Sequence, residues 1–308
     1  MQKLVFIFCL LGFQMQTYAQ TYPIPNDVKR IVFLGNSITY QGQYIEYLEA
    51  YFLNHYPEQS YELINVGLPS ETLSGLSEAN HAGGAFPRPD LHDRLDRVLQ
   101  KTKPDLVFSC YGMNDGIYLP FDESRFEKFK TGIRWLQEEV ENTGAKIIHI
   151  TPPIYDERRG AAYANVLDIY SAWLISQRYT KDWKVINMHW PMRKALEDRR
   201  QRESSFVFAK DGIHPTADGH FFMALQILKG VGEEDLTPWE DRDGFLSNQA
   251  NREKILDLIH QKQVLMKNAW LTYIGHQRPR MPEGISMDVA RQQSEEINQQ
   301  LRALLRKR

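Results

Sequence analysis

Between residues 29 and 229, short apolar runs alternate with longer amphipathic stretches. This alternation is typical of repeated β-α units, in which helices cover both faces of a mostly parallel sheet. Because each run is apolar enough to be covered on both faces, we expect it to form a buried strand. The five predicted strands cover residues 31–34, 62–66, 105–110, 146–150 and 184–187.

Amphipathic helices are predicted between these strands and again after the last of them. In residues 126–140, apolar side chains recur at helical spacing, and a stop signal follows at residues 142–144. Beyond about Gly230 the sequence is rich in Gln, Arg and Glu and contains no strand candidate. The sequence therefore predicts an α/β domain over residues 20–230 and an α-helical C-terminal extension over residues 231–308.

The extension contains two helical patterns, separated by a break at residues 279–284. Apolar residues mark one side of the first pattern from Ile255 to Tyr273 and one side of the second from Ala290 to Leu304. We expect these sides to pack against the main domain. The alternative is that they bind a partner, which includes self-association of the chain.

The first 19 residues have the composition of a secretory signal peptide. Lys3 precedes an apolar run over residues 4–13, and small or polar residues follow at Thr17 and Ala19. The run is too short to span a bilayer, and Cys9 lies inside it rather than at a cleavage point for lipid attachment. We predict cleavage after Ala19 and export to the periplasm or the medium, without a membrane anchor.

The charge balance excludes one large class of partners. The chain has 37 Lys and Arg against 39 Asp and Glu, a net charge of -2, with no long run of one sign. A surface that neutralises nucleic-acid phosphates needs a positive excess, so we expect no nucleic-acid partner. Zinc-protease, paired Cys-x-x-Cys and P-loop motifs are missing, so the sequence predicts no metal and no cofactor.

Cys110 is the only cysteine that follows the predicted signal peptide. A single cysteine cannot form an internal disulfide. Its place in an apolar run favours packing in the core, and a nucleophilic cysteine is the alternative.

A serine and a histidine lie at positions that suit nucleophilic catalysis. Ser37 comes soon after the first predicted strand, where the start of a helix can stabilise negative charge on a substrate. A serine nucleophile needs a general base, and the base needs a third group that fixes its tautomer. Asp211 and His214 are three residues apart, and in a tight turn this spacing lets the carboxylate meet the imidazole. Taken alone, a helix-capping serine and a capping turn with a surface histidine are the simpler interpretations.

Two further polar groups follow predicted strands. Gly67 comes directly after the second strand and offers an unobstructed backbone N–H, and Asn114 comes after the third and offers a side-chain amide. These are the two kinds of donor that stabilise the oxyanion of a tetrahedral intermediate, although each also fits an ordinary turn. More specific than any single residue is their joint order along the chain, which runs Ser37, Gly67, Asn114, Asp211 and His214.

With these residues in this order, the chain resembles the SGNH hydrolase superfamily, also called GDSL esterases and lipases. The resemblance covers about residues 29–229 and implies a flavodoxin-like three-layer α/β/α sandwich with strand order 2-1-3-4-5. One departure is Asn36, where the family usually has Asp, which leaves the geometry of this turn open. The four family blocks match Gly35-Asn36-Ser37-Ile38, Asn65-Val66-Gly67, Gly112-Met113-Asn114-Asp115 and Asp211-Gly212-Ile213-His214.

The resemblance also implies a role for each of these residues. Ser37 would be the nucleophile, His214 the general base and Asp211 the group that orients the base. The backbone N–H groups of Ser37 and Gly67 and the side chain of Asn114 would form the oxyanion hole.

The implied reaction is a two-step acyl transfer through an acyl-enzyme. For an exported chain without a membrane anchor, the expected substrate is an acetyl ester on a carbohydrate. A lipid or thioester hydrolase and a catalytically inactive glycan-binding protein are the alternatives. The candidates for the substrate groove are Tyr40, Phe86, Trp190, the loop at residues 83–89 and residues 151–155, for which a plain connecting loop is the alternative.

Overall fold

The computed structural model describes residues 20–234, 236, 242 and 251–305 of the chain. Within these residues, five strands form a parallel sheet in the order β2-β1-β3-β4-β5, which is the order that the resemblance implies. Each strand begins and ends within one residue of its predicted position. The strands are β1 (Arg30–Gly35), β2 (Glu62–Asn65), β3 (Leu106–Cys110), β4 (Lys146–Ile150) and β5 (Val185–Ile186).

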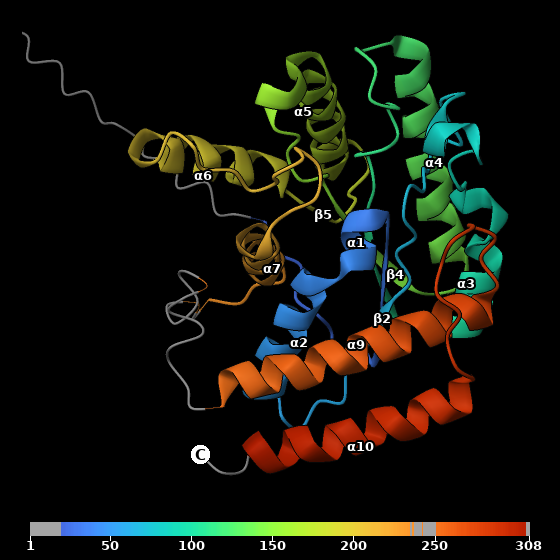
Figure 1. Cartoon of the computed structure of the whole chain (residues 1–308), viewed down its shortest axis with the longest axis vertical. Helices are drawn as coiled ribbons and strands as arrows, with labels where there is room; N and C mark the ends of the chain where they lie inside the picture. The colour runs from blue at the N-terminus through green and yellow to red at the C-terminus, as the bar shows by residue number, and fades with distance from the viewer. Residues whose placement is uncertain (1–19, 235, 237–241, 243–250, 306–308) are drawn as a thin grey trace, which may run out of the picture.

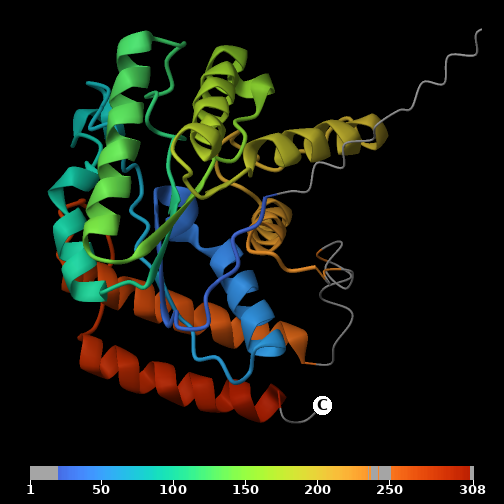
Figure 2. The ribbon, with the colours of Figure 1, turned by 180° about the vertical axis from the view of Figure 1, so that it is seen from behind.

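Helices cover both faces of the sheet (Figures 1 and 2), so the fold is the predicted three-layer α/β/α sandwich. α6 (His189–Arg202) follows β5 and contacts α7. One face carries α2 (Gln43–His55) and α7 (Ala217–Gly230), and the other carries α3 (Leu95–Thr102), α4 (Glu123–Asn142) and α5 (Glu157–Thr180).

The strands form the centre of the core because their side chains are apolar on both faces. Residues 31–34 of β1 are completely buried, and the rings of Phe33 and Phe108 stack with their centroids 5.3 Å apart. A polar exception is His149 of β4, whose Nε2 lies 2.9 Å from Gln137 Oε1. Burial lowers the pKa of His149 to about 3, so this histidine is an uncharged core residue.

Short segments follow the ends of β1 and β2. α1 (Ser37–Gln41) begins two residues after β1, and the loop after β2 contains the 3-10 helices η1 (His81–Gly84) and η2 (Leu91–Asp93). Arg88 holds this loop, because its guanidinium donates to both carboxylate oxygens of Glu78, at 2.6 and 2.7 Å. The predicted loop at residues 83–89 is therefore anchored at its buried arginine.

The C-terminal extension packs on the main domain. α9 (Arg252–Ile274) lies beside α2 and β2, and α10 (Met287–Leu305) runs antiparallel along the outer side of α9 (Figures 1 and 2). Ile259 and Trp270 of α9 are at most 2% exposed and belong to the same hydrophobic core as the sheet. Self-association through these helices stays a prediction.

One expected core position in α9 was wrong. The side chain of Tyr273 is 49% exposed, and its ring lies 4.3 Å from Lys101 Nζ of α3, so it covers a surface cation instead of the core. The next residue, Ile274, is buried in its place. Arg97 of α3 donates to the carbonyl oxygens of Ile274 and Gly275 at 3.0 and 3.1 Å, where the end of a helix carries partial negative charge. α3 therefore binds the end of α9.

The predicted signal peptide, residues 1–19, lies outside the described residues. Among the residues that are described, no helix is both long and apolar enough to cross a bilayer. The same part of the chain holds no group of three or more His, Cys, Asp or Glu side chains that could bind a metal ion.

Candidate active site

Ser37 is the first residue of α1 and follows a tight turn after β1. A Cβ on Gly35 would be 2.2 Å from Thr39 Oγ1, so a side chain does not fit at this position. Asn36 is the N-cap of α1, and its Oδ1 accepts the N–H of Ile38 at 3.1 Å. Asparagine caps helices as well as aspartate does. Asn36, in place of the family's usual Asp, therefore keeps the turn that places Ser37 at the first position of α1.

Asp211 and His214 lie in the turn before α7. Between them, Gly212 has a φ of +86°, a left-handed conformation that favours glycine. Thr216 is the N-cap of α7, as the predicted helix start requires, and its side chain accepts a backbone N–H of the first turn. The cap and the glycine turn together fix where the imidazole of His214 lies relative to the sheet.

Three side chains form one hydrogen-bonded chain at the carboxyl end of the sheet. His214 Nδ1 lies 2.6 Å from Asp211 Oδ2, and His214 Nε2 lies 2.8 Å from Ser37 Oγ. Asp211 Oδ1 accepts the backbone N–H groups of Ile213 and His214, at 2.9 and 2.8 Å, so the carboxylate is held with Oδ2 toward the ring. When the ring proton is on Nδ1, Nε2 is an acceptor and can take the proton of Ser37.

The surroundings of Asp211 keep its carboxyl ionised. Burial raises the pKa of this carboxyl, but the hydrogen bonds from the His214 ring and from two backbone N–H groups lower it more, so the pKa lies below its ordinary value. A negative charge is therefore available to stabilise an imidazolium on His214. Burial lowers the pKa of the neighbouring His220 to about 3, and its neutral ring stacks with Tyr44.

Gly67 lies against the backbone of α1. A Cβ on Gly67 would be 2.4 Å from Tyr40 N and 2.8 Å from Thr39 Cβ, so only a glycine allows this approach to the helix that carries Ser37. The N–H of Gly67 donates to Asn65 Oδ1 at 3.0 Å. The expectation of an unobstructed N–H was wrong, because the short turn after β2 brings the side chain of Asn65 next to Gly67. The Nδ2 of the same Asn65 side chain donates to the Thr39 carbonyl at 2.7 Å.

Asn114 is 2% exposed and is held at both ends of its amide. Its Nδ2 donates to the carbonyl oxygen of Glu71 at 3.0 Å, and its Oδ1 accepts the hydroxyl of Tyr118 at 2.9 Å. Rotating the Asn114 amide by 180° would lose both bonds, so its orientation is fixed. The second N–H of Nδ2 can donate to another acceptor. Asn114 follows β3, which pairs with β1, so it lies at the same edge of the sheet as Ser37. The oxyanion roles of Gly67 and Asn114 stay predictions.

The candidates for the substrate groove differ in exposure. Trp190 of α6 is 37% exposed, and Tyr40 and Phe86 are half-buried. Thr151 is completely buried, and its Oγ1 accepts two backbone N–H groups that lead into α6, both at 2.9 Å. The first residue of the segment 151–155 therefore connects the end of β4 to the start of α6 and has a structural role.

Two basic residues of the extension reach this edge of the sheet, and no sequence pattern singled them out. Lys267 of α9 is 8% exposed, and its Nζ donates to the Tyr40 carbonyl at 2.7 Å and lies 4.0 Å from the Tyr40 ring. Burial lowers the pKa of Lys267 to about 8. Arg278 Nε donates to the carbonyl of Pro69 at 2.8 Å, and its guanidinium lies 5.3 Å from the Phe86 ring. These two cations therefore place the extension beside two of the aromatic groove candidates.

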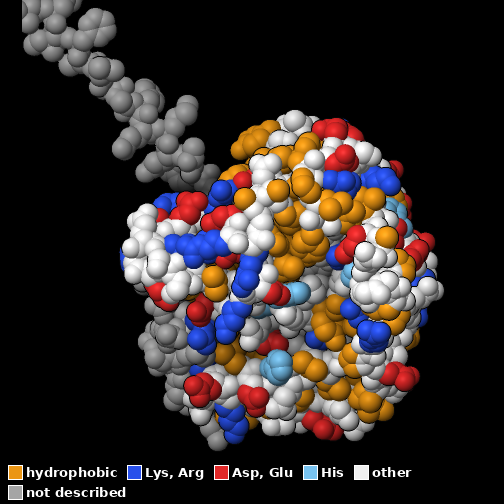
Figure 3. All heavy atoms as spheres, turned by 45° about the horizontal axis from the view of Figure 1, so that its top comes forward, with side chains coloured by type: hydrophobic (Ala, Val, Ile, Leu, Met, Phe, Trp, Pro, Cys, Tyr) orange, Lys and Arg blue, Asp and Glu red, His pale blue; other side chains and the backbone are white. Residues whose placement is uncertain are grey.

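The surface over the strand ends is hollowed. Figure 3, which turns the top of Figure 1 toward the viewer, shows histidine and acidic side chains beside hydrophobic ones at a depression near the centre of this face. A separate cavity of about 360 Å³ lies between α2, β2, α9 and α10. Ser37, Asp211 and His214 do not line that cavity, so it is distinct from the candidate active site.

Cys110, the alternative nucleophile, is 4% exposed at the end of β3. Burial raises the pKa of its thiol to about 12. A thiol with such a pKa is protonated near neutral pH, whereas the thiolate is the nucleophilic form. Cys110 is therefore a core residue.

Comparisons with known proteins identify the family to which the chain belongs. The profile of the GDSL-like Lipase/Acylhydrolase family matches residues 33–221, which is more than half of the chain. None of the curated proteins that were compared with the sequence is similar to it.

Two solved structures illustrate the shared fold. A gut microbial diltiazem-metabolizing enzyme is similar with a TM-score of 0.57 and 20% identity; the match covers 69% of this chain and 49% of that enzyme, about half of its length. A catalytic mutant of Axe2, an acetylxylan esterase from Geobacillus stearothermophilus, has a TM-score of 0.53 and 20% identity, and the match covers 67% of this chain and 95% of Axe2. At this level of identity, the likeness establishes the fold alone.

Proposed function

Because the chain belongs to the GDSL-like lipase/acylhydrolase family and is a carboxylic ester hydrolase, we propose that it releases acetyl and other short acyl groups from carbohydrate esters. The observation that carries the proposal is the hydrogen-bonded chain from Asp211 through His214 to Ser37, with distances of 2.6 and 2.8 Å. This order of carboxylate, imidazole and hydroxyl is the order that serine acyl transfer requires.

In the first half of the proposed reaction, His214 Nε2 takes the hydroxyl proton of Ser37 while Oγ attacks the carbonyl carbon of the ester. The carbonyl oxygen becomes an oxyanion, which the N–H of Ser37 and the second N–H of Asn114 stabilise. The N–H of Gly67, which bonds Asn65 Oδ1 in the free enzyme, is shared between that oxygen and the oxyanion. His214 then gives its proton to the leaving sugar oxygen, and the acyl group stays on Ser37. Asp211 stays ionised and stabilises the imidazolium.

In the second half, a water molecule gives a proton to His214 Nε2 and attacks the acyl carbon on Ser37. The same three donors stabilise the second oxyanion. When this intermediate collapses, the bond to Ser37 Oγ breaks and Oγ takes the proton back from His214. The products are the carboxylic acid and the free enzyme.

Three aromatic residues in the segments that follow the strands support a carbohydrate as the alcohol part of the ester. The rings of Tyr40, Phe86 and Trp190 are partly exposed and offer apolar faces with neighbouring polar groups, which suit the apolar faces and hydroxyls of sugars. An acetylxylan esterase is among the solved structures with this fold. The leader-like composition of residues 1–19 supports a further part of the proposal, which is that the enzyme is exported and meets its substrate outside the cytoplasm.

The test combines covalent labelling with turnover. Intact mass after incubation with a serine-directed fluorophosphonate should show one adduct on the native chain and none on Ser37→Ala. Acetate release from acetylated xylo-oligosaccharides should fall by several orders of magnitude in the same variant, because the nucleophile is lost while the fold is kept. Circular dichroism of both proteins controls for folding.

The same experiment separates the alternatives. A folded native chain that gives no adduct and no acetate would reject the proposal and favour the glycan-binding alternative. Faster turnover of long-chain or thioester substrates than of acetylated sugars would reject the carbohydrate part and favour the lipid or thioester hydrolase.

A further inference from the structure

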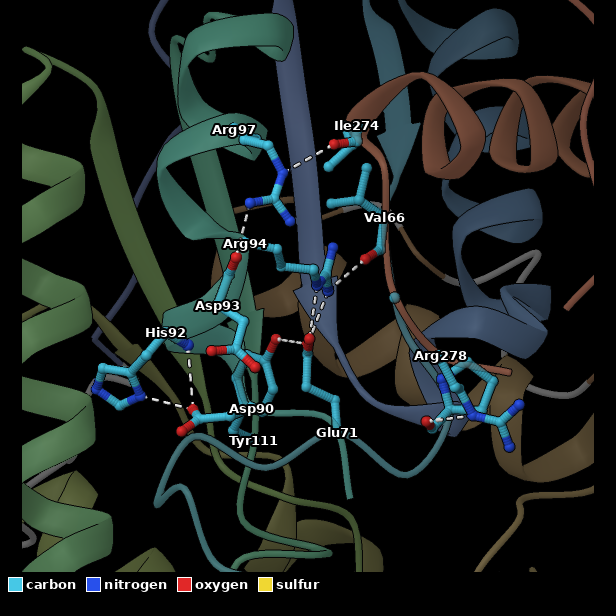
Figure 4. Close-up of polar contacts among 12 residues, drawn as sticks. Val66, Glu71, Asp90, His92, Asp93, Arg94, Arg97, Tyr111, Ile274 and Arg278 are labelled. Atoms are coloured by element: carbon cyan, nitrogen blue, oxygen red, sulfur yellow. Dashed lines mark hydrogen bonds and ion pairs between the residues drawn. The ribbon is translucent and has the colours of Figure 1, made fainter. Parts of the chain in front are cut away.

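A buried ion pair, formed by Glu71 and Arg94 (Figure 4), lies next to the two segments that carry the predicted oxyanion donors Gly67 and Asn114. Glu71 is completely buried, and Arg94 and Tyr111 are 2% and 1% exposed. Arg94 Nε and Nη2 donate to the two carboxylate oxygens of Glu71 at 2.5 and 2.7 Å, and the Tyr111 hydroxyl donates to Glu71 Oε2 at 2.6 Å. We call these three residues the Glu71 cluster. Because desolvation offsets much of the attraction in a buried ion pair, a gain in stability is a poor explanation for it.

Arg94 binds the peptide group that carries the first predicted oxyanion donor. Its Nη2 donates to the carbonyl oxygen of Val66 at 2.9 Å (Figure 4). That carbonyl and the N–H of Gly67 belong to one planar trans peptide group, in which they point in opposite directions. The guanidinium on the carbonyl side and Asn65 Oδ1 on the N–H side together fix the direction of the Gly67 N–H. The positive charge of Arg94 also polarises the peptide and strengthens that N–H as a donor.

Glu71 binds the second predicted donor through its backbone. Its carbonyl oxygen accepts one N–H of Asn114 Nδ2 at 3.0 Å, while its side chain binds Arg94. The position of the Asn114 amide thus depends on where the buried carboxylate of Glu71 is held. A shift of Glu71 would move the remaining N–H of Asn114 away from the reacting carbonyl.

Tyr111 closes the connection between the two loops. It lies three residues before Asn114 in the segment after β3, and its hydroxyl binds a residue of the segment after β2. Asp115, which follows Asn114, accepts the backbone N–H groups of Leu73 and Ser74 at 2.7 and 2.8 Å. The two loops that carry the predicted oxyanion donors are therefore joined on both sides of Asn114.

We propose that the Glu71 cluster is a positioning unit that holds the Gly67 N–H and the Asn114 amide at a fixed separation without touching the substrate. This inference rests on the proposed function, because it requires Gly67 and Asn114 to be the oxyanion donors. Oxyanion donors act on the transition state more than on the bound ester. Disturbing the cluster therefore lowers kcat and leaves KM nearly unchanged.

The first test is Tyr111→Phe, which removes one donor to Glu71 and keeps the ring. Tyr51→Phe is the matched control, because Tyr51 is 2% exposed and its hydroxyl donates to Glu233 Oε2 at 2.7 Å, near the opposite end of α2 from Ser37. For an acetyl ester, kcat should fall about 5- to 20-fold in Tyr111→Phe, a fraction of the ~10²–10³-fold effect of losing a whole donor. KM should stay within about two-fold, and Tyr51→Phe should keep the native kcat.

The second test is Arg94→Lys. A lysine keeps the positive charge, but its ammonium cannot reproduce the planar fork that binds both carboxylate oxygens of Glu71 and the Val66 carbonyl. We expect kcat to fall about 10- to 100-fold with KM within about three-fold. The rate at which a fluorophosphonate modifies Ser37 should fall in parallel, because an oxygen of the adduct occupies the oxyanion position. Urea unfolding of each variant measures its stability separately.

The outcomes distinguish this inference from the proposed function. Native kcat in both Tyr111→Phe and Arg94→Lys, while Ser37→Ala is inactive, would overturn the positioning role. A rise in KM at unchanged kcat, or equal losses of kcat in Tyr111→Phe and Tyr51→Phe, would overturn it as well. Native turnover by Ser37→Ala would instead overturn the proposed function, and the inference that rests on it.

Discussion

Asp211→Asn tests how the turn before α7 selects the tautomer of His214. In the native chain, Asp211 Oδ1 accepts two backbone N–H groups, and Oδ2 lies 2.6 Å from His214 Nδ1. An asparagine that keeps the two backbone bonds must place its NH2 group against Nδ1. His214 then has to accept a proton at Nδ1 and carry its own on Nε2, where it cannot take the proton of Ser37.

The size of the effect follows from the alternative arrangement. Rotating the new amide restores the tautomer, but it sets the NH2 group against the backbone N–H groups of Ile213 and His214. At a side chain that is 52% exposed, each lost bond costs about 1–2 kcal/mol, so the productive form lies about 2–4 kcal/mol higher. At about 1.4 kcal/mol per factor of ten, its population falls about 30- to 1000-fold. The lost carboxylate charge beside the imidazolium adds about another factor of ten, so kcat should fall about 10³-fold.

The assay is steady-state hydrolysis of an acetyl ester, together with ¹⁵N spectra of the labelled protein that report which ring nitrogen of His214 carries the proton. Asp198→Asn, on the exposed side of α6, controls for the loss of a surface carboxylate and should keep the native kcat. A kcat of Asp211→Asn within ten-fold of the native value, or a proton that stays on Nδ1, would refute the tautomer argument.

Three other substitutions test the rest of the site. Gly67→Ala should lower kcat at least ~10²-fold, because the new Cβ would lie 2.4 Å from Tyr40 N. Gly160→Ala is the control and should keep the native kcat, because its Cβ would lie 3.4 Å from the nearest atom. Equal losses of kcat in the two variants would contradict the prediction. Asn114→Ala should lower kcat about 10²–10³-fold with an unchanged circular dichroism spectrum, and near-native turnover would reject its role as a donor. The pKa of Lys267 is lowered to about 8 in the folded chain, and an unfolded lysine titrates near ~10.4. Between these values the unfolded state binds more protons, so stability against urea should rise from pH 8 to pH 10, and the rise should be missing in Lys267→Met; the same rise in both proteins would show that another group causes it.

The strands and the order of the site residues could be predicted because both are local properties of the sequence. The run at residues 62–66 has apolar side chains at Leu63, Ile64 and Val66, and Gly67 follows it directly. A polar or glycine residue in that position of a parallel sheet lies at the edge where ligands bind. The order of the strands came from the resemblance, since periodicity alone does not say which strands are neighbours.

The partners of the site residues could not be predicted, because they come from segments that are distant in sequence. Periodicity shows which side of a helix faces the core, but not which buried polar groups meet. Nothing near Arg94 in the sequence indicates that it is 2% exposed and bound to Glu71. In the same way, no local pattern connects Tyr118 with the amide of Asn114, or the N–H of Gly67 with Asn65.

The hydrogen bond from Lys267 to the carbonyl of Tyr40 joins residues that are 227 positions apart. All the residues of the proposed mechanism precede Gly230, so they leave the ribosome well before α9 does. The end of the helix that carries Ser37 receives its lysine contact only when the last part of the chain has been synthesised and has docked. The contact between the C-terminal extension and the helix that carries Ser37 is therefore among the later contacts that folding can form.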